Sequence, residues 1–212
     1  MPRQAPFGNY FIVNPVERWA AVCVSKNANT GLKAAVLESI GRRVPTTVDE
    51  IHDAFGWVPS DILRPAELGP PPGYTSFVVW RDPVERWYSA VNYLRGRGQF
   101  RVRARMHGLG AVVELRRSLD GAVRVTRRML DGDPLRCDEH FRRQVDHCDL
   151  REIEHVVPIR MLNPWMATHE YTVPRRLNVK ERTLVRDIRI DYVVRSLYER
   201  DYAFNATRAA VG

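Results

Sequence analysis

The strongest constraint on the fold is a strand, a polar loop and a helix that follow one another twice along the chain. Residues 20–24 form a short apolar run typical of a buried strand, and a polar loop separates it from helically spaced apolar residues within 32–40. Residues 77–80 form a second apolar run, and a helical pattern follows within 84–94. Strands that alternate with helices predict a parallel sheet covered on both faces.

The remaining patterns complete this fold prediction. Residues 10–13 and 155–159 are further candidate strands, and residues 190–198 have the spacing of an amphipathic helix. A chain of 212 residues, 44% of them hydrophobic, fits one domain with one sizeable core. We therefore expect an α/β fold: a three-layer, P-loop-like domain over residues 1–212, with a central parallel sheet of four or five strands flanked by helices.

The charge of the chain favours an anionic partner. The net charge is +8 and the isoelectric point is about 9.8, which fits a nucleotide, an acidic acceptor or nucleic acid. Because arginines are spread along the chain, we expect a solvated basic surface and no nucleic-acid partner. No apolar run reaches the roughly 18 residues that a membrane span needs, and residues 1–6 lack an apolar signal region. We expect a cytoplasmic protein without a membrane partner.

The three cysteines form neither a disulfide framework nor a zinc pattern. Cys23 stands apart from the other two in the sequence. Cys137 and Cys148 are expected to be reduced thiols, although the sequence leaves open whether they pair.

The first polar loop is a candidate anion site. Residues 26–31, Lys-Asn-Ala-Asn-Thr-Gly, open the first helix, where unpaired backbone N–H groups and the positive end of the helix dipole attract anions. Lys26 adds a charge and Thr30 adds a hydroxyl donor. The loop resembles a P-loop but lacks its GK[ST] ending, so it offers no obvious magnesium ligand. Taken alone, the loop also fits an ordinary strand-to-helix turn capped by threonine.

A second candidate anion site follows the second strand. Arg81 comes directly after that strand and can bind a phosphate bidentately, and Pro83 suits the first turn of a helix. Ser89 lies two turns further on and can donate to the same phosphate. Two anion sites at neighbouring strand ends predict a nucleotide with phosphate at both ends.

These stretches resemble the sulfotransferases that use 3′-phosphoadenosine 5′-phosphosulfate (PAPS). Residues 24–30 are similar to their 5′-phosphosulfate loop, and residues 77–90, FVVWRDPVERWYSA, to their 3′-phosphate motif. Residues 138–144 and 197–204 resemble two further segments of the Golgi carbohydrate branch and its bacterial relatives. This chain departs from the pattern at Phe141 and Arg143, where the family has Trp and Pro, and at residues 27–29, where Gly or Cys is frequent.

The resemblance implies PAPS as cofactor and a hydroxyl of a carbohydrate or small natural product as acceptor. Lys26 would stabilise the leaving phosphate, and the N–H groups of Ala28 to Gly31 with the Thr30 hydroxyl would hold the 5′-phosphate. Arg81 with Ser89 would bind the 3′-phosphate. Arg86 would be either a further contact or a structural ion-pair partner of a nearby acid. Apart from the resemblance, core and packing roles are expected for Tyr198, Asp201, Tyr202 and Phe204. The predicted cofactor-binding residues are Lys26, Asn27, Ala28, Asn29, Thr30, Gly31, Arg81 and Ser89. No metal is required, because lysine, arginine and helix-end donors supply the positive charge.

Transfer to a hydroxyl also needs a general base. His52 is the one histidine between the two phosphate motifs, where relatives place their base, and an imidazole titrates near neutral pH. Glu50 and Asp53 flank it and can orient or replace it. His140 is the alternative base. A surface histidine explains His52 as well, and a buried structural histidine explains His140.

Two other functions compete with this hypothesis. A kinase-like phosphotransferase needs a Mg²⁺ ligand beside the loop, and the sequence shows neither a GK[ST] ending nor a clear acidic strand end. A basic nucleic-acid-binding module predicts strong, salt-sensitive binding but leaves the paired phosphate motifs unexplained.

Overall fold

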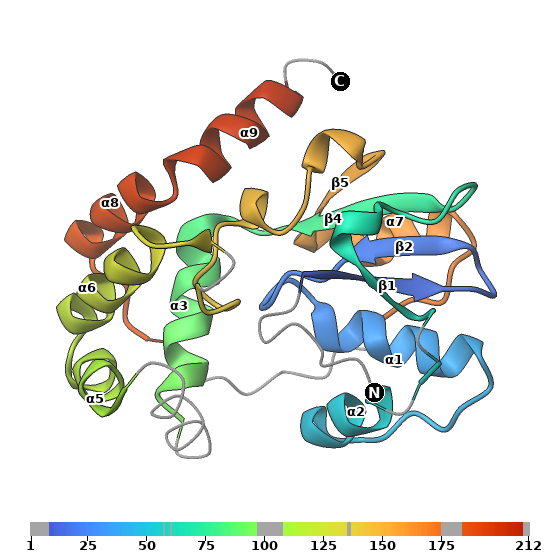
Figure 1. Ribbon diagram of the computed structural model, residues 1–212, viewed down its shortest axis with the longest axis horizontal. Helices are drawn as coiled ribbons and strands as arrows, with labels where there is room; N and C mark the ends of the chain where they lie inside the picture. Colours follow the sequence, from blue (N-terminus) through green and yellow to red (C-terminus); the bar gives the residue numbers. More distant parts are fainter. Residues whose placement is uncertain are drawn as a thin grey trace. The chain divides into compact units, whose positions relative to one another are not determined.

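The computed structural model describes residues 9–56, 58–59, 61–96, 108–134, 137–174 and 184–209 (Figure 1). The chain divides into two compact units. The first comprises Met1–Arg81 and His147–Val179, and the second comprises Asp82–Asp146 and Lys180–Gly212.

The first unit is built on a sheet that has five strands within the described ranges. The strands are β1 (Tyr10–Asn14), β2 (Trp19–Val22), β3 (Leu63–Pro65), β4 (Thr75–Trp80) and β5 (His155–Pro158), and their order is β3-β1-β2-β4-β5. Strands β2, β4 and β5 run parallel, whereas β1 is antiparallel to both of its neighbours. The expected number of strands is therefore confirmed, but the prediction of a wholly parallel sheet is wrong.

The antiparallel pair follows from the short connection between β1 and β2. Only residues 15–18 separate the two strands, and a parallel crossover needs a dozen or more residues. The Asn14 side chain closes this turn, because its Oδ1 accepts hydrogen bonds from the backbone N–H groups of Val16 and Glu17, both at 3.1 Å. The chain therefore reverses into a hairpin before it enters the parallel part of the sheet.

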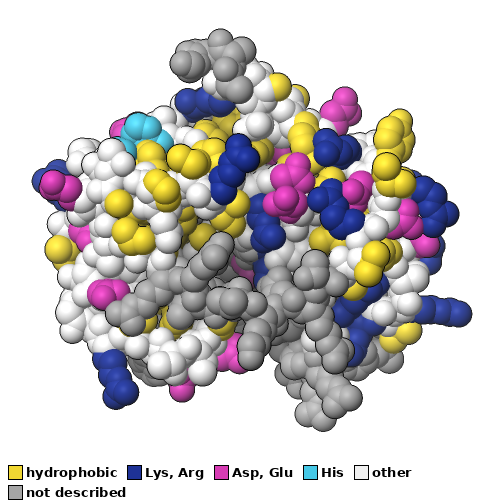
Figure 2. All heavy atoms as spheres, turned by 180° about the vertical axis from the view of Figure 1, so that it is seen from behind, with side chains coloured by type: hydrophobic (Ala, Val, Ile, Leu, Met, Phe, Trp, Pro, Cys, Tyr) yellow, Lys and Arg dark blue, Asp and Glu magenta, His cyan; other side chains and the backbone are white. Residues whose placement is uncertain are grey.

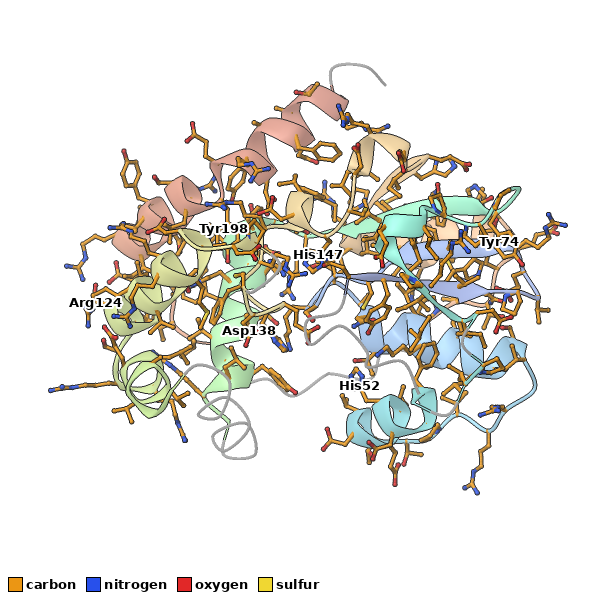
Figure 3. The ribbon with its side chains drawn as sticks, in the orientation of Figure 1. His52, Tyr74, Arg124, Asp138, His147 and Tyr198 are labelled. Atoms are coloured by element: carbon orange, nitrogen blue, oxygen red, sulfur yellow. The ribbon has the colours of Figure 1, made fainter. Side chains whose placement is uncertain are left out.

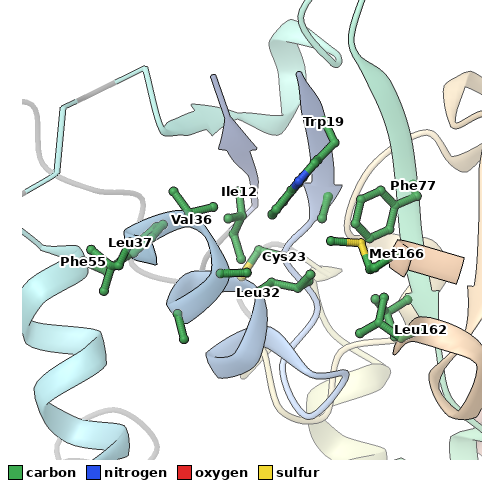
Figure 4. Close-up of a cluster of buried hydrophobic side chains, with 14 of the residues drawn as sticks. Ile12, Trp19, Cys23, Leu32, Val36, Leu37, Phe55, Phe77, Leu162 and Met166 are labelled. Atoms are coloured by element: carbon green, nitrogen blue, oxygen red, sulfur yellow. The ribbon is translucent and has the colours of Figure 1, made fainter. Parts of the chain in front are cut away.

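One hydrophobic cluster joins this sheet to its helices (Figure 4). The helices are α1 (Asn29–Ser39), α2 (Val48–Phe55) and α7 (Leu162–Thr168), with short 3-10 turns at Ala66–Leu68, Leu150–Glu152 and Ile159–Met161. Leu32 of α1, Phe55 of α2 and Met166 of α7 all belong to the cluster, together with Trp19 and Phe77 of the sheet. The expected α/β fold with helices against the sheet is confirmed at this level.

The second unit is helical within its described part. It contains α3 (Pro83–Leu94), α5 (Leu109–Arg117), α6 (Leu119–Leu130), α8 (Ile188–Leu197) and α9 (Glu199–Ala209), with a 3-10 turn at Gln144–Asp146. Pro83 occupies the first turn of α3, as expected, and the Asp82 side chain caps that helix by accepting from the Glu85 N–H. The helix predicted over 190–198 is confirmed as α8.

The segments 138–144 and 197–204 hold each other in the second unit. The Tyr198 hydroxyl donates to the Phe141 carbonyl oxygen (2.6 Å), and the Gln144 N–H donates to the Asp201 carboxylate (3.0 Å). Tyr198 and Asp201 are fully buried, and burial raises the pKa of both side chains. The expectation that these two are packing residues is confirmed.

Arg86 also acts within this network. Its side chain is fully buried, and it donates to the carbonyl oxygens of Arg142 (2.8 Å) and Glu139 (2.9 Å). These bonds attach α3 to the segment 138–144 and give Arg86 a structural role through backbone carbonyl oxygens, whereas its expected ion pair with an acid stays a prediction.

Candidate functional site

The loop between β2 and α1 is held in an unusual backbone conformation. Lys26 and Ala28 both have positive φ, at 69° and 60°, although neither is glycine. Residues with a Cβ rarely adopt this left-handed region of φ, and each one held there lowers the stability of the fold by on the order of 1–3 kcal/mol. A conformation of this kind persists only where surrounding contacts impose it, and it is found most often at functional sites.

Two side-chain contacts fasten this loop to the end of β4. The Asn27 side chain is buried, and its Nδ2 donates to the Val79 carbonyl oxygen at 2.7 Å. Arg81 Nη1 donates to the Lys26 carbonyl oxygen at 3.1 Å. Because β2 and β4 are parallel neighbours, the residues that follow them meet at one edge of the sheet. The structure therefore brings the predicted 5′-phosphosulfate loop and Arg81 together.

The first turn of α1 is open to an anion. Its N-cap residue is Ala28, and within the described ranges no side chain caps it; the first turn also contains no acidic residue. Thr30 lies inside the helix, so the explanation of the loop as a turn capped by threonine does not apply. Uncapped N–H groups at a helix start favour negative charge. The backbone from Ala28 to Gly31 is thus suited to the predicted 5′-phosphate contact.

His52 lies on α2 and approaches the start of α1 (Figure 3). Its Nε2 is 3.4 Å from Thr30 Oγ1, and its Nδ1 is 3.2 Å from Lys33 Nζ. Helix α2 begins with a capping box in which Thr47 and Glu50 bond reciprocally, so the Glu50 carboxylate holds the start of the helix. The structure therefore places His52 beside the loop, although its role as a base stays a prediction.

Lys33 is the residue at this site that sequence reasoning missed. It is 7% exposed, and its Nζ lies 5.7 Å from the centre of the Tyr10 ring and 5.2 Å from that of Phe55. Lysine is rarely buried to this extent. A signal was present in the sequence, because Lys33 is the one cation in the helix 29–39 and has apolar neighbours on both sides.

The other two predicted site residues belong to the second unit. Ser89 is buried on α3. His140 is also buried, with its Nδ1 2.8 Å from the Asp138 carboxylate and its ring stacked on that of Tyr93 at 5.1 Å. A carboxylate at Nδ1 fixes the orientation of an imidazole, as it does for a base or for a structural histidine. The contact of Ser89 with the 3′-phosphate and the role of His140 as alternative base stay predictions.

Among the described residues on the face shown in Figure 2, the arginines do not gather into a stripe. On the face shown in Figure 2, basic and acidic side chains are interspersed. Many of the exposed arginines are paired: Arg124 and Arg128 with Glu114, Arg186 with Asp191, and Arg189 with Asp187. Surface pairs of this kind are typical of a solvated face.

No group of three or more potential metal ligands occurs in the part of the chain that the structure describes. The three cysteines are free thiols, and burial raises the pKa of both Cys137 and Cys148 to about 12. Within the same described residues, no helix is long and apolar enough to cross a membrane.

Comparison of the chain with protein-family models, with curated proteins and with solved structures finds no match. The features of this chain that indicate a function are therefore the loop between β2 and α1, Arg81 and the residues around His52.

Proposed function

We propose that this protein is a PAPS-dependent sulfotransferase with a P-loop-like cofactor site, and that its acceptor is a hydroxyl of a carbohydrate or small natural product. The observation that carries the proposal is the contact between Arg81 and the Lys26 carbonyl oxygen at 3.1 Å. It joins residues from both predicted phosphate motifs at one edge of the sheet, which suits a nucleotide with phosphate at both ends.

Each part of the proposed site has a chemical role. In the transfer, the bond from sulfur to the 5′-phosphate oxygen breaks, the acceptor oxygen bonds to sulfur, and the acceptor proton passes to a base. Lys26 and the open first turn of α1 supply positive charge and N–H donors for the phosphate oxygen that leaves. Arg81 binds the 3′-phosphate through charge-assisted hydrogen bonds, with Ser89 as the second predicted donor. His52 and His140 remain the two candidates for the base.

The proposal extends to the setting of the protein. We propose a cytoplasmic enzyme whose partners are PAPS and its acceptor, with neither nucleic acid nor a membrane as partner. The paired arginines and the interspersed charges of Figure 2 support this choice over a nucleic-acid-binding module.

Removal of magnesium tests the reaction type. If lysine, arginine and helix-end donors supply all the positive charge, turnover of PAPS should proceed at the same initial rate with and without EDTA. A kinase-like phosphotransferase depends on Mg²⁺ to bridge its phosphates. Release of sulfate from PAPS is the measurement, with ATP hydrolysis measured in parallel. Activity on ATP that EDTA abolishes, without activity on PAPS, would favour the phosphotransferase.

A further inference from the structure

The environment of Lys33 determines which groups it can contact. Its side chain is 7% exposed, and no carboxylate pairs with it among the described residues. Its Nζ lies over the rings of Tyr10 and Phe55, and aromatic faces attract a cation. The polar atom that Nζ reaches is His52 Nδ1, at 3.2 Å. A buried cation near two aromatic rings is therefore also in contact with one imidazole nitrogen.

The chemistry of lysine fixes the direction of this contact. An ammonium group has three donors and no acceptor, so Nδ1 of His52 must be the unprotonated, accepting nitrogen. A neutral imidazole then carries its single proton on Nε2, which lies 3.4 Å from Thr30 Oγ1. His52 consequently donates to Thr30. With Nε2 protonated, the lone pair of the imidazole faces Lys33.

Lys33 donates to His52 and His52 donates to Thr30, so the Thr30 hydroxyl is the last member of a chain of donors. Once Oγ1 accepts from His52, its own proton must point elsewhere. Thr30 Oγ1 makes no other hydrogen bond within the described ranges, although a helical threonine often donates to the carbonyl four residues earlier. Its proton is therefore available for an acceptor at the open start of α1.

We infer that Lys33 is a positioning residue, which acts through His52 to make the Thr30 hydroxyl a donor to an oxyanion held at the loop. The identification of that oxyanion as the 5′-phosphosulfate of PAPS rests on the proposed function, whereas the donor chain itself does not. In this arrangement His52 contributes by donating to Thr30.

The tautomer of His52 tests the donor chain without any ligand. Nitrogen-15 NMR of the histidine side chains should show His52 with its proton on Nε2. In Lys33→Met, which keeps the apolar stem but removes the donor, the form with the proton on Nδ1 should become populated beside the Nε2–H form. A His52 protonated on Nδ1 in the unaltered protein would overturn the inference, because that tautomer cannot accept from Lys33 and is the one a base at Nε2 needs.

Nucleotide binding tests whether the chain of donors contributes to binding an anion. Thr30→Val and Lys33→Met should each weaken binding of 3′-phosphoadenosine 5′-phosphate by about 2–10-fold, the range for one net hydrogen bond. The double variant should bind the nucleotide about as tightly as the single variant with the lower affinity, because both changes remove the same donor. Thr168→Val, which removes an exposed hydroxyl from α7, is the matched control and should bind normally. If the losses of affinity in the two single variants added fully in the double variant, the proposed chain of donors from Lys33 to Thr30 would be contradicted.

Variants of His52 separate this role from that of a base. Glutamine presents a carbonyl acceptor and an N–H donor, so His52→Gln should recover the nucleotide affinity that His52→Ala loses. A fall of about 10²-fold or more in PAPS turnover by His52→Gln, with intact affinity in both variants, would instead make His52 the base and overturn the inference. Failure of the unaltered protein to bind the nucleotide would refute the proposed function, and NMR would still decide the donor chain.

Discussion

Lys26→Met is expected to lower kcat for PAPS turnover by about 10²–10³-fold, the usual cost of losing one preorganised donor to a developing negative charge. Negative charge builds up on the 5′-phosphate oxygen as its bond to sulfur breaks. Lys26 lies in the loop that precedes α1, at the edge of the sheet where Arg81 meets the same loop. Binding of the product nucleotide should change much less, because the lost interaction is strongest in the transition state.

Hydrolysis of PAPS suffices as the assay for Lys26, since the leaving phosphate is the same whether water or an alcohol attacks. Lys26→Arg is the matched control, because it keeps the charge, and it should retain more activity than Lys26→Met. Glycine is unsuitable there, since the positive φ of Lys26 would itself favour it. Loss of nucleotide affinity with an unchanged kcat would contradict this role, because it would mean that Lys26 contributes equally to the ground state and the transition state.

Arg81→Ala is expected to weaken binding of 3′-phosphoadenosine 5′-phosphate by about 1.5–3 kcal/mol, or roughly 10–100-fold, as a charge-assisted contact is lost. The structure adds a second effect, because Arg81 also donates to the Lys26 carbonyl oxygen. Binding of AMP should therefore weaken as well, but by a smaller factor. Calorimetry with the two nucleotides measures both effects.

Ser89→Ala accompanies this test and should cost less than Arg81→Ala, because it removes a neutral donor. Its effect should be confined to the nucleotide with a 3′-phosphate. Identical losses for both nucleotides in Arg81→Ala would show that Arg81 acts only by supporting the loop.

Much of the fold follows from local patterns. The runs at 20–24 and 77–80 predict β2 and β4 because each is a short apolar stretch followed by a polar loop and a helix. The antiparallel direction of β1 was not predicted, because its signal is a turn. Asn14 and Pro15 end the strand, and residues 15–18 leave no room for a crossover. β3 has three residues and no alternation, so only its pairing with β1 reveals it.

Part of the site could also be predicted from the local pattern of a strand followed by a polar loop and a helix. Lys26 and Arg81 follow parallel strands, and strand ends meet at one edge of the sheet. The neighbours of His52 could not be predicted, since they depend on how α2 packs against α1. Lys33 and His52 are 19 residues apart, and neither lies within a recognised motif. The donor role inferred for His52 therefore emerged only from the structure.

The most direct test of the central claim is calorimetry of the unaltered protein with 3′-phosphoadenosine 5′-phosphate, AMP and ATP. A site that reads phosphate at both ends of the nucleotide should bind 3′-phosphoadenosine 5′-phosphate at least about tenfold more tightly than AMP or ATP, since the 3′-phosphate contact is expected to contribute about 1.5–3 kcal/mol. Equal affinity for AMP, or tighter binding of ATP, would contradict the assignment of a PAPS site.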